Sequence, residues 1–371
     1  MPESGKILRF RTRPISAGYS REEAAERAAE FLAIPASERN AACVDGTLAD
    51  SDVLSSVLSR LWAIINTSPA TVAEAAPQIH KWVTAREDRQ FFFDERDYFL
   101  GESALLAGAS LRLIGKREET ERWLDRSDAA FRHTVAPTAH LARVSYTRLA
   151  LRYDQHRHDE LLELTPSVSL TFKKLGMVND FVKCEFLQAM SLKELGRLEE
   201  SATLLEAMTQ NNQVDSALAG MALVNLGGLR SEQGEFDKAR LAYAQAAPLL
   251  REARRFAALA DLKLMLGGTL QRTGRLLAAI EAFRESVSDH LALGMATRAA
   301  YGRLFVAGAL LEADRPREAE WEIRAALPTI DAQEMGPEAV AALGLLSESV
   351  RQRRTDPKAL LMLRECLQDT N

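Results

Sequence analysis

A short turn segment recurs six times along this 371-residue chain, and the repeat constrains the fold more than any other feature. Each turn lies between two amphipathic stretches that are long enough to form helices. The spacings between successive turns are 41, 40, 38, 40 and 40 residues, and the turns begin at Gly115, His156, Gly196, Gly234, Gly274 and Asp314. A period of this length indicates an array of helical units, each of which packs only against its neighbours.

The first residue of each turn suits the end of a helix. Glycine readily takes the left-handed backbone conformation that ends many helices, and Asp314 and His156 belong to the few other residue types that tolerate it. Pro316 follows Asp314 by two residues, where the first turn of the next helix is expected and proline is well accepted. The sequence therefore predicts a helix before and after each turn.

The residues on either side of the turns form a pattern that identifies the kind of repeat. Gly227 and Gly267 each follow a leucine and stand seven residues before a turn glycine. After the turn, apolar residues recur at steps of three and four, the helical period, with a small Ala239 followed by an aromatic Tyr243 in the fourth unit. The small alanine allows the two helices to approach closely.

These units resemble tetratricopeptide repeats, and the resemblance extends from about Asp94 to Ile330. Their period exceeds the usual repeat of about 34 residues and is similar to the longer-helix variant found in sensor and adaptor proteins of signalling pathways. The resemblance implies an all-α fold, namely a right-handed superhelical array of antiparallel helix pairs, or α-solenoid. The match is weakest at the second unit, where Leu161 replaces the small alanine.

The two ends of the chain differ from the repeats. We predict a flexible basic tail at 1–19, an N-terminal helical cap at 20–93, six repeats at 94–331 and C-terminal capping helices at 332–371. The closing helices are expected at 337–354 and 357–369, because an array must cover its last apolar face.

The N-terminal part contains three predicted helices. A capping box at Ser20 and Glu23 begins a helix that ends near Ala33. Two more are expected near 51–66 and 69–85, the second with a kink at Pro77. These helices form either a separate cap, which we favour, or two degenerate repeats.

Composition excludes several classes of function. A net charge of −5 gives no reason to expect nucleic acid or an anionic membrane as the main partner. There is no run of 18 apolar residues and no secretory signal, so we expect neither a membrane span nor export. The three cysteines, Cys43, Cys184 and Cys366, lie far apart without a CxxC spacing, which predicts reduced thiols and a cytoplasmic protein.

No motif indicates catalysis, a metal or a cofactor. The glycine doublets at 227–228 and 267–268 lie inside predicted helices, where small size serves packing, whereas a phosphate cradle needs a loop of free amides. His156 and His158 form a His-x-His pair in the second turn, but a zinc site needs further convergent ligands. We therefore expect no enzyme activity, no cofactor and no metal.

An aromatic cluster at 90–99 has two interpretations. The favoured one is a hydrophobic joint that fixes the N-terminal helices to the first repeat, together with Trp62, Trp82 and Trp123. The other is an exposed binding patch. The burial of Phe91 to Phe93 would distinguish the two.

The family resemblance also implies where a ligand binds. Groove positions in such repeats lie thirteen, ten, six, three and two residues before the turn residue, on the first helix of each pair. Asn225, one helical turn from such a position, is added because its amide can pair with a peptide backbone. The candidate partner-binding residues are then Arg112, Arg143, Tyr146, Tyr153, Lys183, Phe186, Lys193 and Asn225.

The candidate residues of the first three units are basic and aromatic, which favours an acidic or mixed peptide as the partner. The predicted function is a scaffold or adaptor that binds a protein or peptide in its concave groove. The alternative is a regulatory sensor in which the N-terminal helices act as the effector and the repeats bind a signalling peptide or partner. The sequence carries no signal for a particular oligomeric state.

Overall fold

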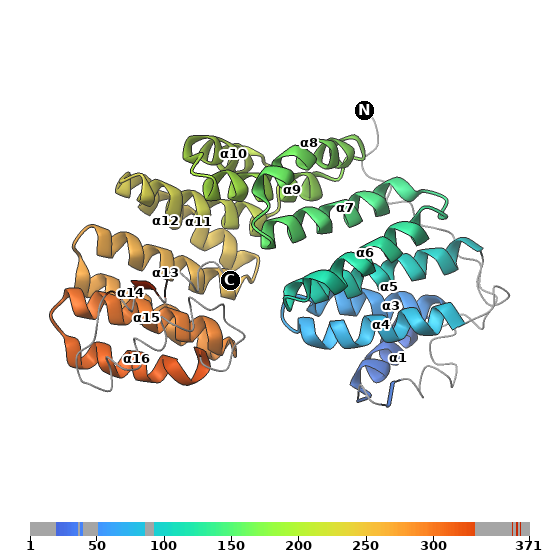
Figure 1. Ribbon diagram of the computed structural model, residues 1–371, viewed down its shortest axis with the longest axis horizontal. Coiled ribbons are helices and arrows are strands. Elements are labelled where there is room, and N and C mark those ends of the chain that lie inside the picture. The colour runs from blue at the N-terminus through green and yellow to red at the C-terminus, as the bar shows by residue number, and fades with distance from the viewer. Residues whose placement is uncertain are drawn as a thin grey trace. The chain divides into compact units, whose positions relative to one another are not determined.

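The computed structural model describes residues 20–35, 38–39, 51–85 and 93–330, together with positions 358, 361, 362 and 364. Within these residues the chain forms fifteen helices and no strand (Figure 1). The chain divides into two compact units, residues 1–176 and 177–371. The boundary between them falls between the second and third predicted repeats.

The first unit contains seven helices. They are α1 (Arg21–Ala33), α3 (Ser51–Ile64), α4 (Pro69–Ala85), α5 (Phe93–Leu113), α6 (Arg117–Phe131), α7 (Pro137–Asp154) and α8 (His158–Lys174). Helix α5 packs on α6 and α7 packs on α8, so each of these pairs is one predicted repeat. The capping box at Ser20 is present, because its hydroxyl accepts from the Glu23 amide while Glu23 accepts from the Ser20 amide.

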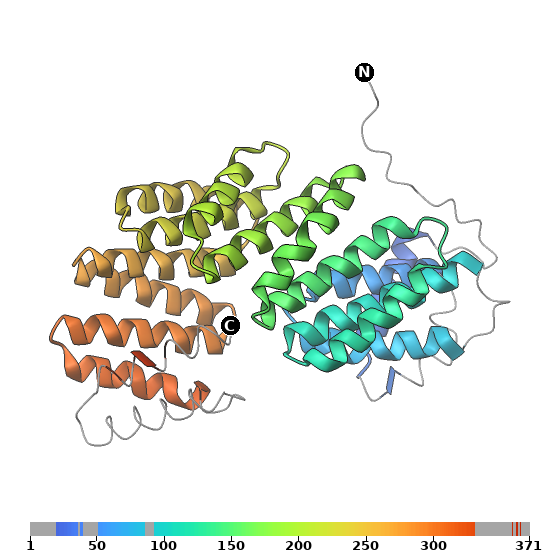
Figure 2. The ribbon, with the colours of Figure 1, turned by 45° about the horizontal axis from the view of Figure 1, so that its top comes forward.

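The second unit contains four helix pairs, which stack side by side (Figure 2). The helices are α9 (Val178–Glu194), α10 (Leu198–Gln210), α11 (Ser216–Glu232), α12 (Phe236–Glu252), α13 (Phe256–Arg272), α14 (Leu276–Ala292), α15 (Ala296–Glu312) and α16 (Pro316–Ile330). The first helix of each pair also contacts the first helix of the next pair. The predicted array of helix pairs is thus confirmed within this unit.

All six predicted turns are present at the expected residues. The backbone φ of the first turn residue is positive in each, including the two that are not glycine, His156 at 55° and Asp314 at 56°. The same conformation recurs between pairs, at Gly176, Arg254 and Gly294. The left-handed residue directs the chain back along the helix that precedes it, and this reversal produces antiparallel pairs.

The N-terminal helices share one hydrophobic core with the first repeat. Buried side chains from α1, α3 and α4, such as Phe31, Leu61 and Ile79, form a single cluster with Phe99 and Leu106 of α5. This cluster agrees with the interpretation of the aromatic segment as a joint, as far as Phe99 is concerned. The side chains of Phe91 to Phe93 lie outside the described residues, and their role stays a prediction.

Small residues allow the two helices of a pair to pack closely. A Cβ atom on Gly227 would lie 2.5 Å from the ring of Tyr243, and one on Gly267 would lie 2.5 Å from the ring of Phe283. The packing interpretation holds for these first glycines of the two doublets. It does not hold for the second glycines, because a Cβ on Gly228 would approach only the Met265 sulfur, at 3.8 Å, and one on Gly268 would meet nothing within 4 Å.

Several predictions concern residues that the structure does not describe. The tail at 1–19 and the closing helix at 337–354 lie outside the described residues, and of the second closing helix only Lys358, Leu361, Met362 and Arg364 are described, all helical. The division into tail, cap, repeats and closing helices stays a prediction. Over the described part of the chain, none of the helices combines the length and apolarity needed to cross a bilayer.

Candidate functional site

A pocket of about 290 Å³ opens on the second unit, along the first helices of its four pairs. Thirteen residues line it, all between positions 193 and 301. They are Lys193, Met221, Val224, Asn225, Gly228, Glu232, Ala258, Asp261, Leu264, Met265, His290, Arg298 and Tyr301. Only His290 comes from the second helix of a pair, α14, while the others belong to α9, α11, α13 and α15.

The repeat places equivalent residues along this pocket. Met221, Asp261 and Tyr301 each stand thirteen residues before a turn residue, and all three line the pocket. Asn225 and Met265, each nine residues before a turn, lie one helical turn further along the same faces. The pocket is therefore a groove built by the repeat itself, with one strip of wall from each successive first helix.

The groove is apolar in its middle and carries ion pairs towards both ends. Lys193 of α9 lies 3.3 Å from Glu232 of α11, and Arg298 of α15 donates to Asp261 of α13 at 2.6 Å. Because each pair joins one cation to one carboxylate, the formal charges of these four lining residues sum to zero. The side chains between the two pairs include Met221, Val224, Leu264 and Met265.

A buried histidine supports the ion pair at the α15 end. His290, almost fully buried, places Nε2 3.1 Å from Asp261 and Nδ1 3.4 Å from the hydroxyl of Ser286. The order Ser286, His290, Asp261 superficially resembles a hydrolase triad. However, Ser286 is fully buried one turn before His290 on the same helix, so no substrate can reach its hydroxyl. The arrangement instead holds the Asp261 carboxylate in place.

Asn225 keeps hydrogen-bonding capacity for a ligand. Its amide nitrogen donates to the Met221 carbonyl at 2.9 Å, the only hydrogen bond it makes with the described residues. An asparagine amide has two N–H donors and one carbonyl oxygen. One N–H and the oxygen therefore remain available on the groove wall.

Lys193 and Asn225 are the two candidate residues that the structure brings together in this pocket. Lys183 and Phe186, also on α9, do not line it. Lys183 pairs with Asp180 of its own helix at 2.9 Å, and Phe186 packs against the core between α9, α10 and α11.

The candidate residues of the first unit are engaged in contacts within that unit. Arg112 pairs with Asp154 at 2.7 Å. Arg143 pairs with the buried Glu102 and places its guanidinium 5.2 Å from the Trp62 ring centroid. Trp62 in turn donates to Glu102 at 3.0 Å. The predicted basic lining is therefore largely neutralised by internal carboxylates.

The two candidate tyrosines of the first unit lie on α7. Both Tyr146 and Tyr153 are half-buried, and the Tyr153 ring meets the His158 ring edge-on at a centroid distance of 5.4 Å. This contact joins the two helices of the second pair.

Two of the family-implied groove positions form contacts between neighbouring repeats. The residue three before one turn contacts the residue two before the next turn in every pair of neighbours within a unit, and we call these the lateral contacts. They are Arg112–Asp154 at 2.7 Å, Lys193–Glu232 at 3.3 Å, Ser231–Arg272 at 3.3 Å and Gln271–Glu312. Arg112 and Lys193 were predicted as ligand contacts, and the structure gives them this role in joining repeats.

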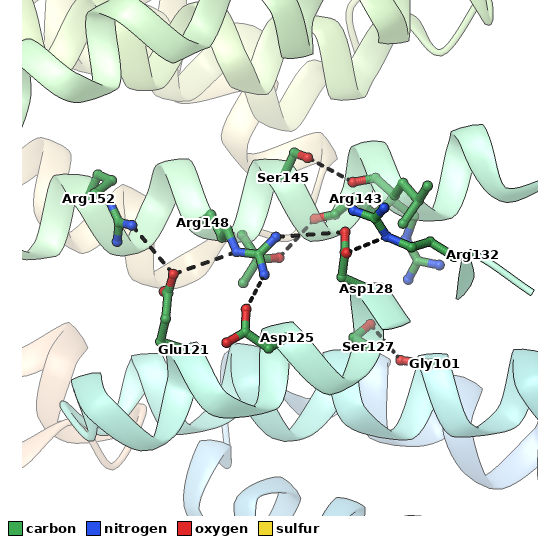
Figure 3. Close-up of polar contacts among 12 residues, drawn as sticks. Gly101, Glu121, Asp125, Ser127, Asp128, Arg132, Arg143, Ser145, Arg148 and Arg152 are labelled. Carbon is green, nitrogen blue, oxygen red and sulfur yellow. Dashed lines mark hydrogen bonds and ion pairs between the residues drawn. The ribbon is translucent and has the colours of Figure 1, made fainter. Parts of the chain in front are cut away.

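A second polar interface joins α6 to α7 in the first unit (Figure 3). Arg148 of α7 reaches Asp125 at 2.6 Å and Glu121 at 3.7 Å, and Arg152 reaches Glu121 at 3.4 Å. Asp128 continues the acidic row along α6 and lies 3.9 Å from Arg148. The cations and carboxylates of this junction pair with each other, so it presents no cluster of unpaired charge.

No group of three or more potential metal-ligating residues converges within the described ranges. His156 and His158 contact each other edge-on, with ring centroids 5.8 Å apart. At this turn the two histidine side chains therefore contact each other through their rings.

Comparison with known proteins assigns the fold. No family model matches the chain, and no curated protein matches it by sequence. A Rap protein in complex with competence and sporulation factor superimposes with a TM-score of 0.56 at 13% identity, covering 94% of this chain and all of the other. Aspartyl phosphate phosphatase F from Bacillus subtilis gives a TM-score of 0.53 at 11% identity, with 96% and 97% covered.

A third structure is a signal-transduction ATPase from Pyrococcus horikoshii that has a tetratricopeptide repeat sensor. It matches with a TM-score of 0.53 at 9% identity, covering 86% of this chain and 52% of the ATPase. The chain has a tetratricopeptide-like helical repeat fold, and these likenesses concern the fold alone.

Sequence reasoning missed three residues of the pocket that matter for its chemistry. Arg298 stands sixteen residues before its turn, beyond the positions that the family pattern uses, and Met265 stands nine before. His290 lies on α14, the second helix of its pair, which was not considered as groove wall. The nine-residue offset that Met265 shares with Asn225 was the available signal.

Proposed function

We propose that the protein is a scaffold or adaptor that binds a peptide, or an extended segment of a partner protein, in the groove of its second unit. The observation that carries the proposal is the alignment of Met221, Asp261 and Tyr301, equivalent residues of three consecutive repeats, along one pocket. A ligand that crosses successive first helices meets the same kind of position on each of them. A groove of this form suits an elongated chain better than a compact small molecule.

The chemistry of the wall supports a peptide ligand. The unused N–H and carbonyl oxygen of Asn225 can pair with one peptide unit of an extended backbone, which has one acceptor and one donor. Met221 and Met265 add flexible, polarisable side chains that adapt to different apolar partners. The backbone of the bound peptide would thus contribute affinity whatever its sequence, and the apolar residues of the groove wall would contact its side chains.

The regulatory-sensor alternative requires N-terminal helices that can separate from the repeats. In the first unit these helices share a buried core with α5, through Phe99 and Leu106. Separation would expose that core to water, so the scaffold is the favoured function. The Rap protein of similar fold forms a complex with competence and sporulation factor, which is consistent with a binding role for this architecture.

Selection from a displayed library of random nonapeptides on the full chain tests the proposal. The variant Met265→Arg places a charged side chain on the groove wall, at a residue that is 42% exposed and can change without disrupting the core. Leu241→Arg is the matched control, because Leu241 is 60% exposed on α12 and does not line the pocket.

We expect enriched peptides to lose binding to Met265→Arg and to keep binding to Leu241→Arg, with both variants showing the helical circular dichroism of the parent. Enriched peptides that bind both variants as well as the parent, or no enrichment over an unrelated helical protein, would refute binding in this groove.

A further inference from the structure

We infer that the ligand of this groove is an extended peptide of about seven to nine residues, apolar over its middle, with one carboxylate that docks on Arg298. The inference rests on the proposed function and specifies the class of ligand. It follows from the span of the groove, the distribution of its apolar residues and the hydrogen-bonding groups that remain unused along it.

The length follows from the helices that the groove crosses. Lys193 belongs to α9 and Arg298 to α15, so the lining spans three steps from one first helix to the next. Packed helices lie about 8–10 Å apart, which gives a span of roughly 24–30 Å. An extended chain rises about 3.3 Å per residue, so about seven to nine residues cover this distance.

The middle of the peptide should be apolar. Between the two ion pairs the wall includes the apolar side chains of Met221, Val224, Leu264 and Met265, together with the amide of Asn225. A charged ligand residue placed there would lose its hydration without gaining an ionic partner. Alternate residues of an extended peptide point to one side, so two or three apolar side chains would enter the pocket.

The α15 end offers hydrogen-bond donors that the described residues leave unused. Each carboxylate oxygen of Asp261 accepts one hydrogen bond, one from His290 and the other from Arg298. Arg298 uses one of its five N–H groups for this bond, has no second partner among the described residues, and remains 44% exposed. A ligand carboxylate can therefore add to the free side of the guanidinium.

The position of Arg298 is fixed before a ligand arrives. His290 is buried and tied to Ser286, and it holds the carboxylate on which Arg298 rests. A guanidinium held in this way loses little side-chain freedom when it binds a carboxylate, and such charge-assisted bonds are stronger than neutral ones. His290 and Asp261 thus act as positioning residues for Arg298.

The α9 end does not offer a second carboxylate site. Lys193 contacts one oxygen of Glu232, and the other carboxylate oxygen of Glu232 makes no hydrogen bond with the described residues. A ligand carboxylate that approaches Lys193 would lie beside this oxygen of Glu232, which accepts from no described donor, whereas both oxygens of Asp261 already accept a hydrogen bond. The two ends of the groove therefore differ in their unused hydrogen-bonding groups, and this difference favours one direction of the bound peptide.

The test uses one groove-dependent peptide from the nonapeptide selection, synthesised with a fluorescent label. Its affinity is measured by fluorescence anisotropy for the full chain and for Arg298→Ala, and again after the acidic residue of the peptide is replaced by its amide. We expect each change alone to weaken binding about tenfold, and both together to weaken it little more than either alone, because they remove one interaction. Arg240→Ala, on the exposed face of α12, should leave the affinity unchanged.

The outcomes separate this inference from the proposed function. Groove-dependent peptides that lack an acidic residue, or that bind Arg298→Ala as tightly as the parent, would overturn the carboxylate site and leave the groove as the binding surface. Peptides that are insensitive to Met265→Arg would overturn the groove itself. Circular dichroism and the melting temperature of Arg298→Ala verify that the variant is folded.

Discussion

Two adjacent glycines in α13 provide a sharp test of how the helix pairs are held together. A Cβ atom on Gly267 would lie 2.5 Å from two ring atoms of Phe283, a fully buried side chain on α14. A Cβ on Gly268 would have nothing within 4 Å. Both residues lie inside the same helix, so Gly267→Ala and Gly268→Ala change the helix propensity equally and differ in packing.

The expected magnitudes follow from two effects. Replacing glycine by alanine inside a helix is worth about 1 kcal/mol in favour of folding, through the reduced freedom of the unfolded chain. Inserting a methyl group into a packed core costs about 1–3 kcal/mol when neighbouring side chains must move. We therefore expect Gly268→Ala to raise the free energy of unfolding by about 0.5–1 kcal/mol. Gly267→Ala should instead leave it unchanged or lower it by up to about 2 kcal/mol.

Urea unfolding followed by circular dichroism measures both variants against the parent. The difference between the two free energies of unfolding isolates the packing effect, because the propensity effect cancels. For a folding unit of roughly 200 residues, a change of 1 kcal/mol corresponds to about 2–4 °C in melting temperature. Equal stability of the two variants would show that the Phe283 ring does not rest against Gly267, and the assigned pairing of α13 with α14 would then be wrong.

Two further predictions concern buried ionisable side chains. Burial raises the pKa of the Cys184 thiol to about 12. In the double variant Cys43→Ser, Cys366→Ser, where Cys184 is the only cysteine left, a thiol reagent at pH 8 should therefore react only after the protein unfolds. Rapid reaction of the folded variant would contradict the burial of this residue. Burial against α13 also raises the pKa of Tyr243 to about 12, whereas an unfolded tyrosine ionises near pH 10. The stability that the neutral phenol contributes is present below pH 10 and is lost as the pH rises towards 12. Tyr243→Phe should therefore flatten this decline in urea titrations, and an unchanged decline would show that another group causes it.

Much of the fold could be predicted because its determinants are local. The positive φ at Gly234 depends on one residue type, and the capping box at Ser20 depends on two residues three apart. The apolar faces of the second helices, such as Ala239 and Tyr243, follow from periodicity, and both are buried. Each of these signals is complete within one repeat, so a single sequence contains it.

The groove could be predicted only in part, since a groove is made by several repeats together. Met221, Asp261 and Tyr301 each stand thirteen residues before a turn residue, one of the offsets that the family resemblance implies, and all three line the pocket. The sequence could not predict the contact between Arg298 and Asp261. This contact depends on how far one helix pair is displaced from the next, and no local sequence pattern encodes that displacement. The same holds for His290, which reaches the groove from the second helix of its pair.

The lateral contacts show which partners two of the basic candidate residues have within the structure. In a sequence, a lysine or arginine on a concave wall indicates an anionic ligand when its partners are unknown. Arg112 and Lys193 both stand three residues before a turn, and each faces an acidic residue two before the next turn, Asp154 or Glu232. The pairing follows from the period, because residues with nearly the same offset in successive units lie opposite one another. An excess of positive charge in such an array has to be counted between neighbouring repeats. On that count Arg298 differs from Arg112 and Lys193, because Asp261, the carboxylate that holds it, also accepts a hydrogen bond from the buried His290.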